Sequence, residues 1–260
     1  MIFWKCFLVI FLFFLIGIGN AAAVEQIPIT RSYTMNNVIF DGKWTFFEEW
    51  KKSSLYSLNY DDGTQIELRM AHQDNFVYVF VDDITETHFA KGSDRAIFCF
   101  DGKNDNSTVP DVDDYCFGVA LGGKVPFVLQ GGSPLALTDH FTKIPNPEDV
   151  IGISSVSDEN DHYTDIPHPS YEFRVPTDLI GRSDLYGFYL GVYHTDSKIT
   201  YSFPENLTSS SSEIPNPSKW GEVVSPDQSL PEFPLPLLAL LPSLLFVIFF
   251  SKRKGISFNY

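Results

Sequence analysis

The feature that most constrains the fold is a succession of short apolar runs, each closed by a turn signal, with no long stretch of helical apolar period. β-Branched and aromatic residues dominate these runs, and several alternate apolar with polar residues as half-buried strands do. This pattern predicts an all-β domain. Two packed antiparallel sheets, a β-sandwich, are the simplest way to bury so many short strands.

The expected strands lie at 55–58, 65–72, 76–81, 95–100, 115–120, 125–129, 170–175, 187–193 and 220–224. The second and third flank a polar turn at 73–75 and are expected to form a hairpin. Together the runs predict one sandwich domain over residues 30–225, which is long enough to bury a full core.

Residues 94–121 combine two strands with an acidic loop and form a long-looped hairpin. Six side chains of the loop could supply oxygen ligands: Asp101, Asn104, Asp105, Asp111, Asp113 and Asp114. A hard cation would relieve the repulsion among the carboxylates, and calcium, which accepts several oxygens in a flexible geometry, is the natural candidate. A solvated acidic loop that binds no ion is the alternative, because the EF-hand pattern is absent.

The same hairpin carries two of the three cysteines. Counted inward from the loop, Phe100 lies opposite Tyr115 and Cys99 opposite Cys116, and opposed strand residues are close enough for a disulfide. Cys6 lies in the N-terminal apolar run. We therefore expect a Cys99–Cys116 disulfide in an oxidising compartment.

Both ends of the chain carry apolar segments. Residues 1–23 have the charged start, apolar run and small-residue end of a secretory signal peptide cleaved after Ala23, with an uncleaved anchor as the alternative. The run 235–250 predicts a transmembrane segment, and the basic tail 251–260 is then cytoplasmic. The domain is expected to be exported and anchored at the outer face of the cell membrane by the tether 226–234.

The last four residues of that tether, Pro-Glu-Phe-Pro at 231–234, resemble the PEF-type sorting signal of archaeal surface proteins. That resemblance implies that the apolar segment is temporary and is cut away with the tail. The alternative is a plain single-pass anchor. Both interpretations place the domain on the cell surface.

Charge and motifs exclude several functions. The formal net charge is −15, and an acidic surface repels the phosphates of nucleic acids, so nucleic-acid binding is excluded. The common hydrolase, zinc-protease, redox and phosphate-binding motifs are absent from the sequence, which predicts a protein that is not an enzyme. The adjacent Glu48 and Glu49 are expected to be solvated. The six histidines show no metal spacing beyond the loose pair His162 and His168, and are expected in surface loops.

The order of several short motifs carries a resemblance. A DG…W start runs from Asp41 to Trp50, a strand at 76–83 ends in two aspartates, Asp94 leads a strand into the acidic loop, and Trp220-Gly221-Glu222 closes the domain. Over residues 36–225 this order resembles the family 9 carbohydrate-binding module and the wider DOMON-like sandwich superfamily. The resemblance implies a calcium-stabilised, jelly-roll-like β-sandwich that binds a ligand and catalyses nothing, with metal ligands in the region of the acidic loop.

The sequence assigns no ligand-binding residue. Trp44, Trp50 and Trp220 are the obvious candidates for stacking on a sugar, but Trp50 and Trp220 fall in the framework motifs and are expected in the core, and no pair of exposed aromatics that would clamp a sugar can be assigned. An exposed aromatic platform could come from four tyrosines: Tyr163, Tyr171, Tyr189 and Tyr193. The predicted partner is a glycan or a glycosylated surface component.

Two alternative functions stay open at this point. Some DOMON-type relatives bind haem for electron transfer, and Met70 and His72 share one face of a strand, although a distant second ligand such as Met35 or His194 would be required. The other alternative is a purely structural surface protein.

The remaining motifs concern the surface. Asn106 and Asn206 begin N-x-S/T sequons, which predict glycosylation at exposed loops. The segment 204–219, rich in Ser and Pro, is expected to be an unstructured excursion before the last strand.

Overall fold

The computed structural model describes residues 25–132 and 140–225. The predicted signal peptide, tether, transmembrane run and basic tail lie outside the described residues. Within the described ranges, none of the helices combines the length and the apolar character of a bilayer span.

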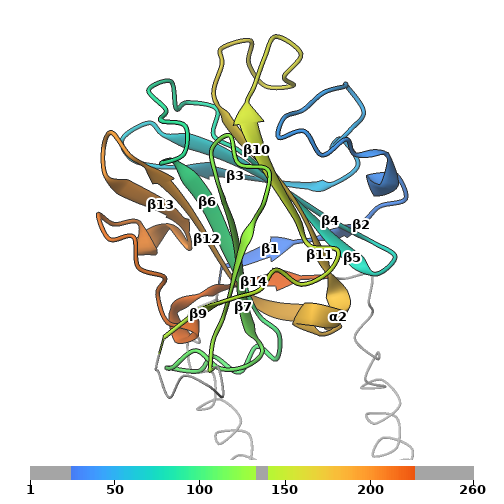
Figure 1. Ribbon diagram of the computed structural model, residues 1–260, viewed down its shortest axis with the longest axis vertical. Coiled ribbons are helices and arrows are strands. Elements are labelled where there is room, and N and C mark those ends of the chain that lie inside the picture. The colour runs from blue at the N-terminus through green and yellow to red at the C-terminus, as the bar shows by residue number, and fades with distance from the viewer. Residues whose placement is uncertain (1–24, 133–139, 226–260) are drawn as a thin grey trace, which may run out of the picture.

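Two β-sheets pack face to face, as Figure 1 shows, with β6, β7 and β12 in one layer and β4, β5 and β11 in the other. The eight-stranded sheet has the order β1-β14-β12-β6-β7-β8-β9, and β13 also pairs with β12. Its strands are β1 (Gln26–Pro28), β14 (Gly221–Val224), β12 (Leu185–His194), β6 (Arg95–Asp101), β7 (Asp114–Ala120), β8 (Phe127–Gln130), β9 (Thr142–Ile144) and β13 (Ile199–Phe203).

The six-stranded sheet has the order β10-β11-β5-β4-β2, and β3 also pairs with β4. Its strands are β10 (Ile151–Val156), β11 (Pro169–Pro176), β5 (Phe76–Asp82), β4 (Gln65–Gln73), β2 (Thr30–Arg31) and β3 (Ser54–Asn59). The helices are short: α2 (Thr177–Ile180) and the 3₁₀ turns η1 (Met35–Asn37), η2 (Glu205–Leu207) and η3 (Pro217–Lys219).

The β-sandwich expected from the sequence is confirmed, with one correction to the strand directions. Each expected strand is present to within a few residues at its ends, and β4 and β5 form the expected hairpin. The sheets are mixed rather than purely antiparallel, because β1 runs parallel to β14 and β2 runs parallel to β4. Both parallel strands come from the N-terminal segment, which adds to sheet edges without a hairpin to set its direction.

The inner faces of the two sheets enclose an aromatic core. Phe98 lies at its centre, with ring centroids 4.9 Å from Phe173 of the opposite sheet and 5.4 Å from Phe117. Phe98, Phe117 and Phe173 are each fully buried. Edge-to-face and offset pairs of this kind add about 0.5–1.5 kcal/mol each beyond the area they bury. This core fixes which side chains of every strand point outward.

The hairpin register and the disulfide are confirmed. Phe100 pairs with Tyr115 and Cys99 with Cys116 between β6 and β7. The two cysteines form a disulfide with Cα atoms 4.0 Å apart, and both are fully buried on the outer face of the eight-stranded sheet. The bond therefore closes the base of the acidic loop.

Loops cover the outer face of the six-stranded sheet. Trp44 and Trp50 are 1% and 0% exposed and pack against Phe80, which confirms the expected interior place of Trp50 and shows that the Trp44 ring is buried as well. Glu49 corrects the expectation of a solvated carboxylate: it is 1% exposed and accepts hydrogen bonds from the backbone N–H groups of Ile39 and Thr45, both at 2.7 Å. It satisfies donors that the irregular loop would otherwise leave unpaired.

Candidate functional site

The outer face of the eight-stranded sheet carries the candidate ligand-binding surface. Tyr189 and Trp220, with the disulfide, form a buried cluster on this face, and Ile97, Leu129, Phe141, Leu207 and Ile214 pack partly buried against it. Trp220 is 4% exposed, its ring stacks between those of Phe141 and Tyr189, and its indole N–H donates to the Pro215 carbonyl. Trp220 is therefore buried, as expected, but it lies in a cluster on the outer face of the sheet and not between the two sheets.

Two glycines let aromatic rings lie flat on this sheet. A Cβ atom at Gly118 would come within 2.3 Å of the Phe127 ring, and one at Gly191 within 2.6 Å of the Tyr189 hydroxyl oxygen. Any larger residue at either position would push the ring off the strand. Burial raises the pKa of Tyr189 to about 12, so its hydroxyl stays neutral and able to donate a hydrogen bond.

Two adjoining depressions open on this face. The first, of about 150 Å³, is lined mainly by Arg95, Phe127, Tyr189 and Tyr193. The second, of about 490 Å³, is lined by Pro110, His140, Phe141, Glu213 and Asn216. Leu129, Ser212 and Ile214 line both. We call the two together the outer groove.

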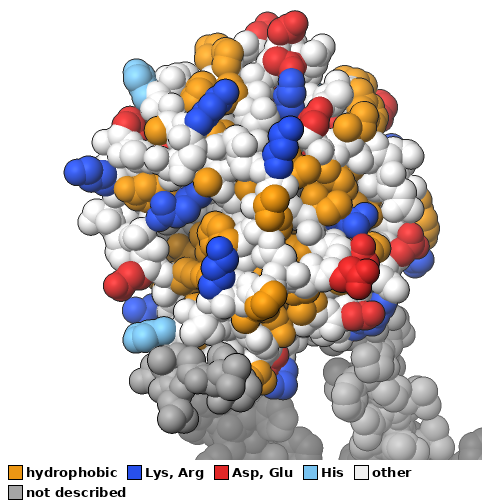
Figure 2. All heavy atoms as spheres, in the orientation of Figure 1, with side chains coloured by type: hydrophobic (Ala, Val, Ile, Leu, Met, Phe, Trp, Pro, Cys, Tyr) orange, Lys and Arg blue, Asp and Glu red, His pale blue; other side chains and the backbone are white. Residues whose placement is uncertain are grey.

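Arg95 and Tyr193 form one end of the outer groove. The Arg95 guanidinium lies 4.3 Å from the centroid of the Tyr193 ring, a favourable cation–π distance. Both side chains are partly exposed. Figure 2 shows hydrophobic side chains in groups on the visible face of the molecule, with Lys and Arg side chains between them. The outer groove itself carries both signs of charge, Arg95 in the first depression and Glu213 in the second.

The four candidate tyrosines divide between the interior and the surface. Tyr171 is fully buried in the sandwich core. Tyr163 lies over the other sheet, where its hydroxyl accepts a 2.6 Å hydrogen bond from Arg69. Tyr189 and Tyr193 line the outer groove. Sequence could not make this division, because it depends on which face each strand turns to the core.

The segment 204–219 forms one wall of the groove. It contains no strand, as expected, but it is not a free excursion into solvent. Thr200 and Ser209 exchange backbone hydrogen bonds, and Leu207 and Ile214 lie against the buried cluster. Apolar contacts thus hold this polar segment on the sheet.

The acidic loop uses many of its oxygens to satisfy its own backbone. Asp105 accepts from the N–H of Ser107, Asp111 from that of Asp113, and Asp114 from that of Asp111. Asp113 forms an ion pair with Lys103. These contacts are the turn chemistry expected of Asp in loops.

A smaller part of the loop does converge. Asp101 and Asp114 face each other across the base of the hairpin and are each 1% exposed. Burial and the neighbouring carboxylates raise the pKa of Asp114 to about 8. Among the described residues, the side-chain oxygen of Asn104 is buried without a hydrogen-bond partner, and its amide donates to Glu222. The six predicted ligands are thus split between a buried base and an exposed rim, and calcium there stays a prediction.

The side chains considered for haem do not converge. Met70 packs between the sheets, whereas Met35 belongs to the cluster on the outer side of the six-stranded sheet. Both ring nitrogens of His194 face carboxylates, Nε2 at 2.6 Å from Asp83 and Nδ1 at 2.8 Å from Glu86. Met35, Met70 and His194 therefore do not lie on opposite sides of one space that could hold a haem.

Two of the six histidines correct the expectation of surface positions. His168 is 0% and His194 is 4% exposed, and each bonds to a buried aspartate. His162 stacks on Trp44 with ring centroids 4.6 Å apart. Asn106 and Asn206, the predicted glycosylation sites, are exposed on loops, and their modification stays a prediction.

Comparison with known proteins gives few similarities. No family model matches the sequence, and no curated protein matches it. Among solved structures, a family 9 carbohydrate-binding module from Caldicellulosiruptor kristjanssonii in complex with cellotriose is 13% identical, with a TM-score of 0.48, over 77% of this chain and 93% of that chain. The same kind of module in complex with glucose is 14% identical, with a TM-score of 0.47, over 77% of this chain and 95% of that chain.

Proposed function

We propose that this protein is a non-catalytic glycan-binding domain whose ligand lies in the outer groove. The observation that carries the proposal is the pairing of partly exposed aromatic rings with hydrogen-bonding side chains on a rigid sheet. Tyr193 and Phe127 offer ring faces, and Arg95 offers guanidinium donors beside them.

The second depression supplies polar groups suited to sugar hydroxyls. His140, Ser212, Glu213 and Asn216 line it and are exposed. Phe141 and Leu129 provide its apolar floor. Ligand sites commonly combine an apolar lining with a few placed polar groups, and two adjoining depressions offer room for more than one sugar ring.

Three further parts of the proposal rest on the sequence. The mature domain is exported and anchored on the cell surface by its C-terminal segment, whose residues lie outside the described ranges. Calcium stabilises the acidic loop, supported by the buried pair Asp101 and Asp114 and by the unpartnered Asn104 oxygen. The ligand is a glycan or a glycosylated surface component.

Affinity electrophoresis through gels containing soluble cellulose, xylan, mannan or polygalacturonate tests glycan binding. We expect retention on at least one polymer, and a loss of about fivefold in affinity for Tyr193→Ala, since one stacked aromatic contributes on the order of 1 kcal/mol. Arg95→Ala should weaken retention as well.

The matched control is Phe47→Ala. Phe47 is an aromatic residue with 62% exposure on the loop over the other sheet, away from the outer groove. It should bind as the wild type does. Retention that Tyr193→Ala and Arg95→Ala leave unchanged would move the site elsewhere, and no retention on any polymer would favour a structural surface protein.

A further inference from the structure

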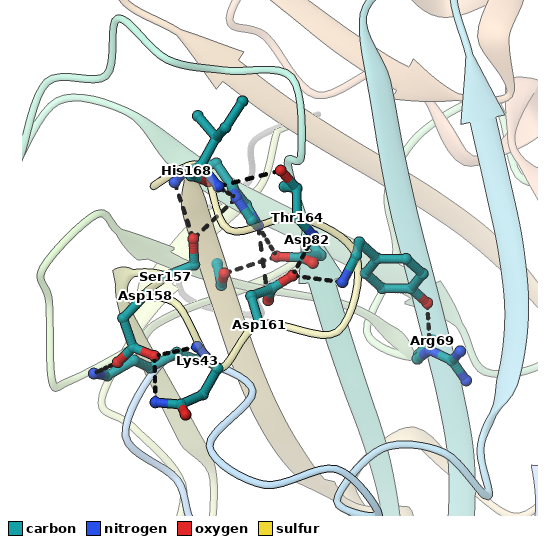
Figure 3. A network of polar contacts seen from close by, with 12 residues as sticks. Lys43, Arg69, Asp82, Ser157, Asp158, Asp161, Thr164 and His168 are labelled. Carbon is teal, nitrogen blue, oxygen red and sulfur yellow. Dashed lines mark hydrogen bonds and ion pairs between the residues drawn. The ribbon is translucent and has the colours of Figure 1, made fainter.

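A buried cluster of two aspartates and a histidine lies under the loop over the six-stranded sheet. Asp82 is the last residue of β5, His168 directly precedes β11, and Asp161 belongs to the loop 157–168 between β10 and β11. Figure 3 shows the three side chains converging from these separate segments. The side chains of Asp82 and His168 are 0% exposed, and that of Asp161 is 1% exposed.

Each of the three side chains is also held by a hydrogen bond to a group outside the cluster. Asp82 Oδ1 accepts from the Ser170 hydroxyl at 2.7 Å. Asp161 Oδ1 accepts from the backbone N–H groups of Tyr163 at 2.8 Å and Thr164 at 3.3 Å. The Nδ1 atom of His168 lies 2.7 Å from the Ile166 carbonyl oxygen, to which it donates. These contacts fix the orientation of all three groups.

Two carboxylate oxygens of the cluster lack the hydrogen bonds that a buried oxygen needs. Within the described part of the chain, Asp82 Oδ2 and Asp161 Oδ2 are buried and have no hydrogen-bond partner. His168 Nε2 lies 2.8 Å from Asp82 Oδ1 and 3.8 Å from Asp161 Oδ2. A buried carboxylate oxygen without a partner is costly, because the interior cannot replace the water it loses.

A positive charge is therefore needed at the centre of this cluster. A proton on His168 Nε2 would supply part of it, because this atom lies 2.8 Å from Asp82 Oδ1. One imidazolium donates a single Nε2–H, however, and two carboxylates face it. The nearer oxygen of the second carboxylate, Asp161 Oδ2, is 3.8 Å from that nitrogen and is therefore poorly compensated.

The geometry points to a divalent metal. One ligand atom from each of the three residues lies within 4.8 Å of the other two, close to the separations of about 3 to 4 Å between ligands that share one ion about 2 Å from each. A histidine that donates its other ring N–H to a backbone carbonyl is the usual second-shell arrangement of a metal ligand. Imidazole with two carboxylates favours zinc over calcium, which takes oxygen ligands.

An entry route is also present. Asp161 lines a depression of about 400 Å³ together with Thr45, Phe46, Phe47, Asn160 and His162. This depression opens beside the cluster and has room for the water that would complete a four-coordinate site.

We propose that Asp82, Asp161 and His168 bind a structural zinc ion that holds the loop 157–168 against the six-stranded sheet. The zinc ion takes the place of a proton on His168 Nε2, and its two positive charges neutralise the carboxylates of Asp82 and Asp161. The loop in turn places Tyr163 and His162 against Trp44, so the ion stabilises the loops that cover the outer face of the six-stranded sheet. This proposal is independent of the glycan-binding proposal, which concerns the opposite sheet.

Elemental analysis and thermal unfolding of the full chain test the proposal. After dialysis against zinc and removal of free ion, we expect about one zinc per wild-type chain. Free zinc at a hundredfold excess over its Kd should raise the melting temperature by about 5 to 10 °C, and a chelator should reverse the shift. Cobalt in place of zinc should give a visible absorption band that His168→Gln removes.

The informative variant is Asp161→Asn, which keeps an oxygen for the two backbone N–H groups and so preserves the loop turn. It should lose bound zinc and the melting shift. The control is Asp158→Asn in the same loop, where Asp158 bonds to Lys43 and to Asn160 rather than to the cluster. Should wild type and Asp161→Asn bind equal zinc, or should zinc and chelator leave the wild-type melting curve unchanged, a protonated His168 alone occupies the cluster and the proposal fails.

Discussion

The acidic loop and the Asp82–Asp161–His168 cluster are both rich in carboxylates, but they differ in how those carboxylates are satisfied. In the loop, nearly contiguous aspartates accept hydrogen bonds from their own backbone, and Asp113 pairs with Lys103. In the cluster, Asp82 at the end of β5 meets two residues of the distant loop 157–168 in the interior, and two of the carboxylate oxygens have no hydrogen-bond partner among the described residues.

The difference shows that a high local density of Asp in sequence is weak evidence for a metal. Asp is also the residue that turns recruit to satisfy backbone N–H groups. A buried oxygen without a hydrogen-bond partner is stronger evidence. Removing it from water costs free energy, and a bound cation would offset that cost. The predictions below test this distinction.

The largest expected effect is that of Asp82→Ala. The change removes the acceptor for Ser170 and the counter-charge of His168, both fully buried, so we expect a loss of about 3 to 5 kcal/mol in the free energy of unfolding. Urea unfolding followed by tryptophan fluorescence measures it. Asp105→Ala in the exposed part of the acidic loop is the control and should cost within about 0.5 kcal/mol. Equal costs for the two variants would contradict the contrast drawn between the regions.

The disulfide at the base of the acidic loop should have the next largest effect. Replacing Cys99 and Cys116 together with alanine should lower the free energy of unfolding by roughly 3 kcal/mol, because the unfolded chain regains the freedom of a loop of this length. Urea unfolding of the double variant measures the loss. Intact-mass analysis of the unreduced wild type should show two hydrogens missing, and two thiols that alkylate in denaturant without reductant would disprove the bond.

Calcium should stabilise the acidic loop by a similar or smaller amount. At a hundredfold excess over its dissociation constant, an ion that binds only the folded state adds about 2.7 kcal/mol. The melting temperatures of the wild type with calcium and with chelator should therefore differ. Replacing Asp111, Asp113 and Asp114 with Asn should remove that difference. If the two wild-type curves coincide, the acidic loop binds no calcium and its carboxylates only accept hydrogen bonds within the turns. Zinc should not replace calcium here, which keeps the two sites distinguishable.

Much of the sandwich could be predicted from sequence because it follows local patterns. Apolar alternation and turn residues located the strands of the central hairpins, and counting from the loop gave the register of Cys99 with Cys116. Five strands were missed: β1, β2, β9, β10 and β13. The strands β1, β2 and β9 have two or three residues, which carry no periodic signal, and the parallel edge pairing of β1 with β14 depends on distant segments.

The candidate sites were harder to predict because they depend on distant pairing. Asp82 and His168 are 86 residues apart, and their juxtaposition requires β5 to pair with β11. The signals available were the two successive aspartates that end an otherwise apolar strand and the His162/His168 spacing. In the outer groove, Gly118 and Gly191 were an unused signal, since a glycine inside a strand often marks the close approach of another group.

The smallest predicted effect concerns His194, the second buried histidine. Burial alone would lower its pKa, but the hydrogen bond that His194 donates to Asp83 and the charges of Asp83, Glu86 and Asp94 raise it above the usual 6.5. The folded protein therefore holds this proton after the unfolded chain has released it. The stabilisation is fully present below about pH 6.5 and is lost as the pH rises through the folded pKa.

Urea midpoints at pH 6, 7.5 and 9 measure this dependence. Burial also raises the pKa values of Asp83 and Glu86, so their contributions decline with rising pH as well, and His194→Gln should flatten the decline without abolishing it. His140→Gln, at an exposed histidine that lines the outer groove and lies outside this cluster, is the control and should keep the wild-type slope. A wild-type slope in His194→Gln would show that His194 is neutral in the folded protein, in which case one of its two carboxylate contacts must carry the proton instead.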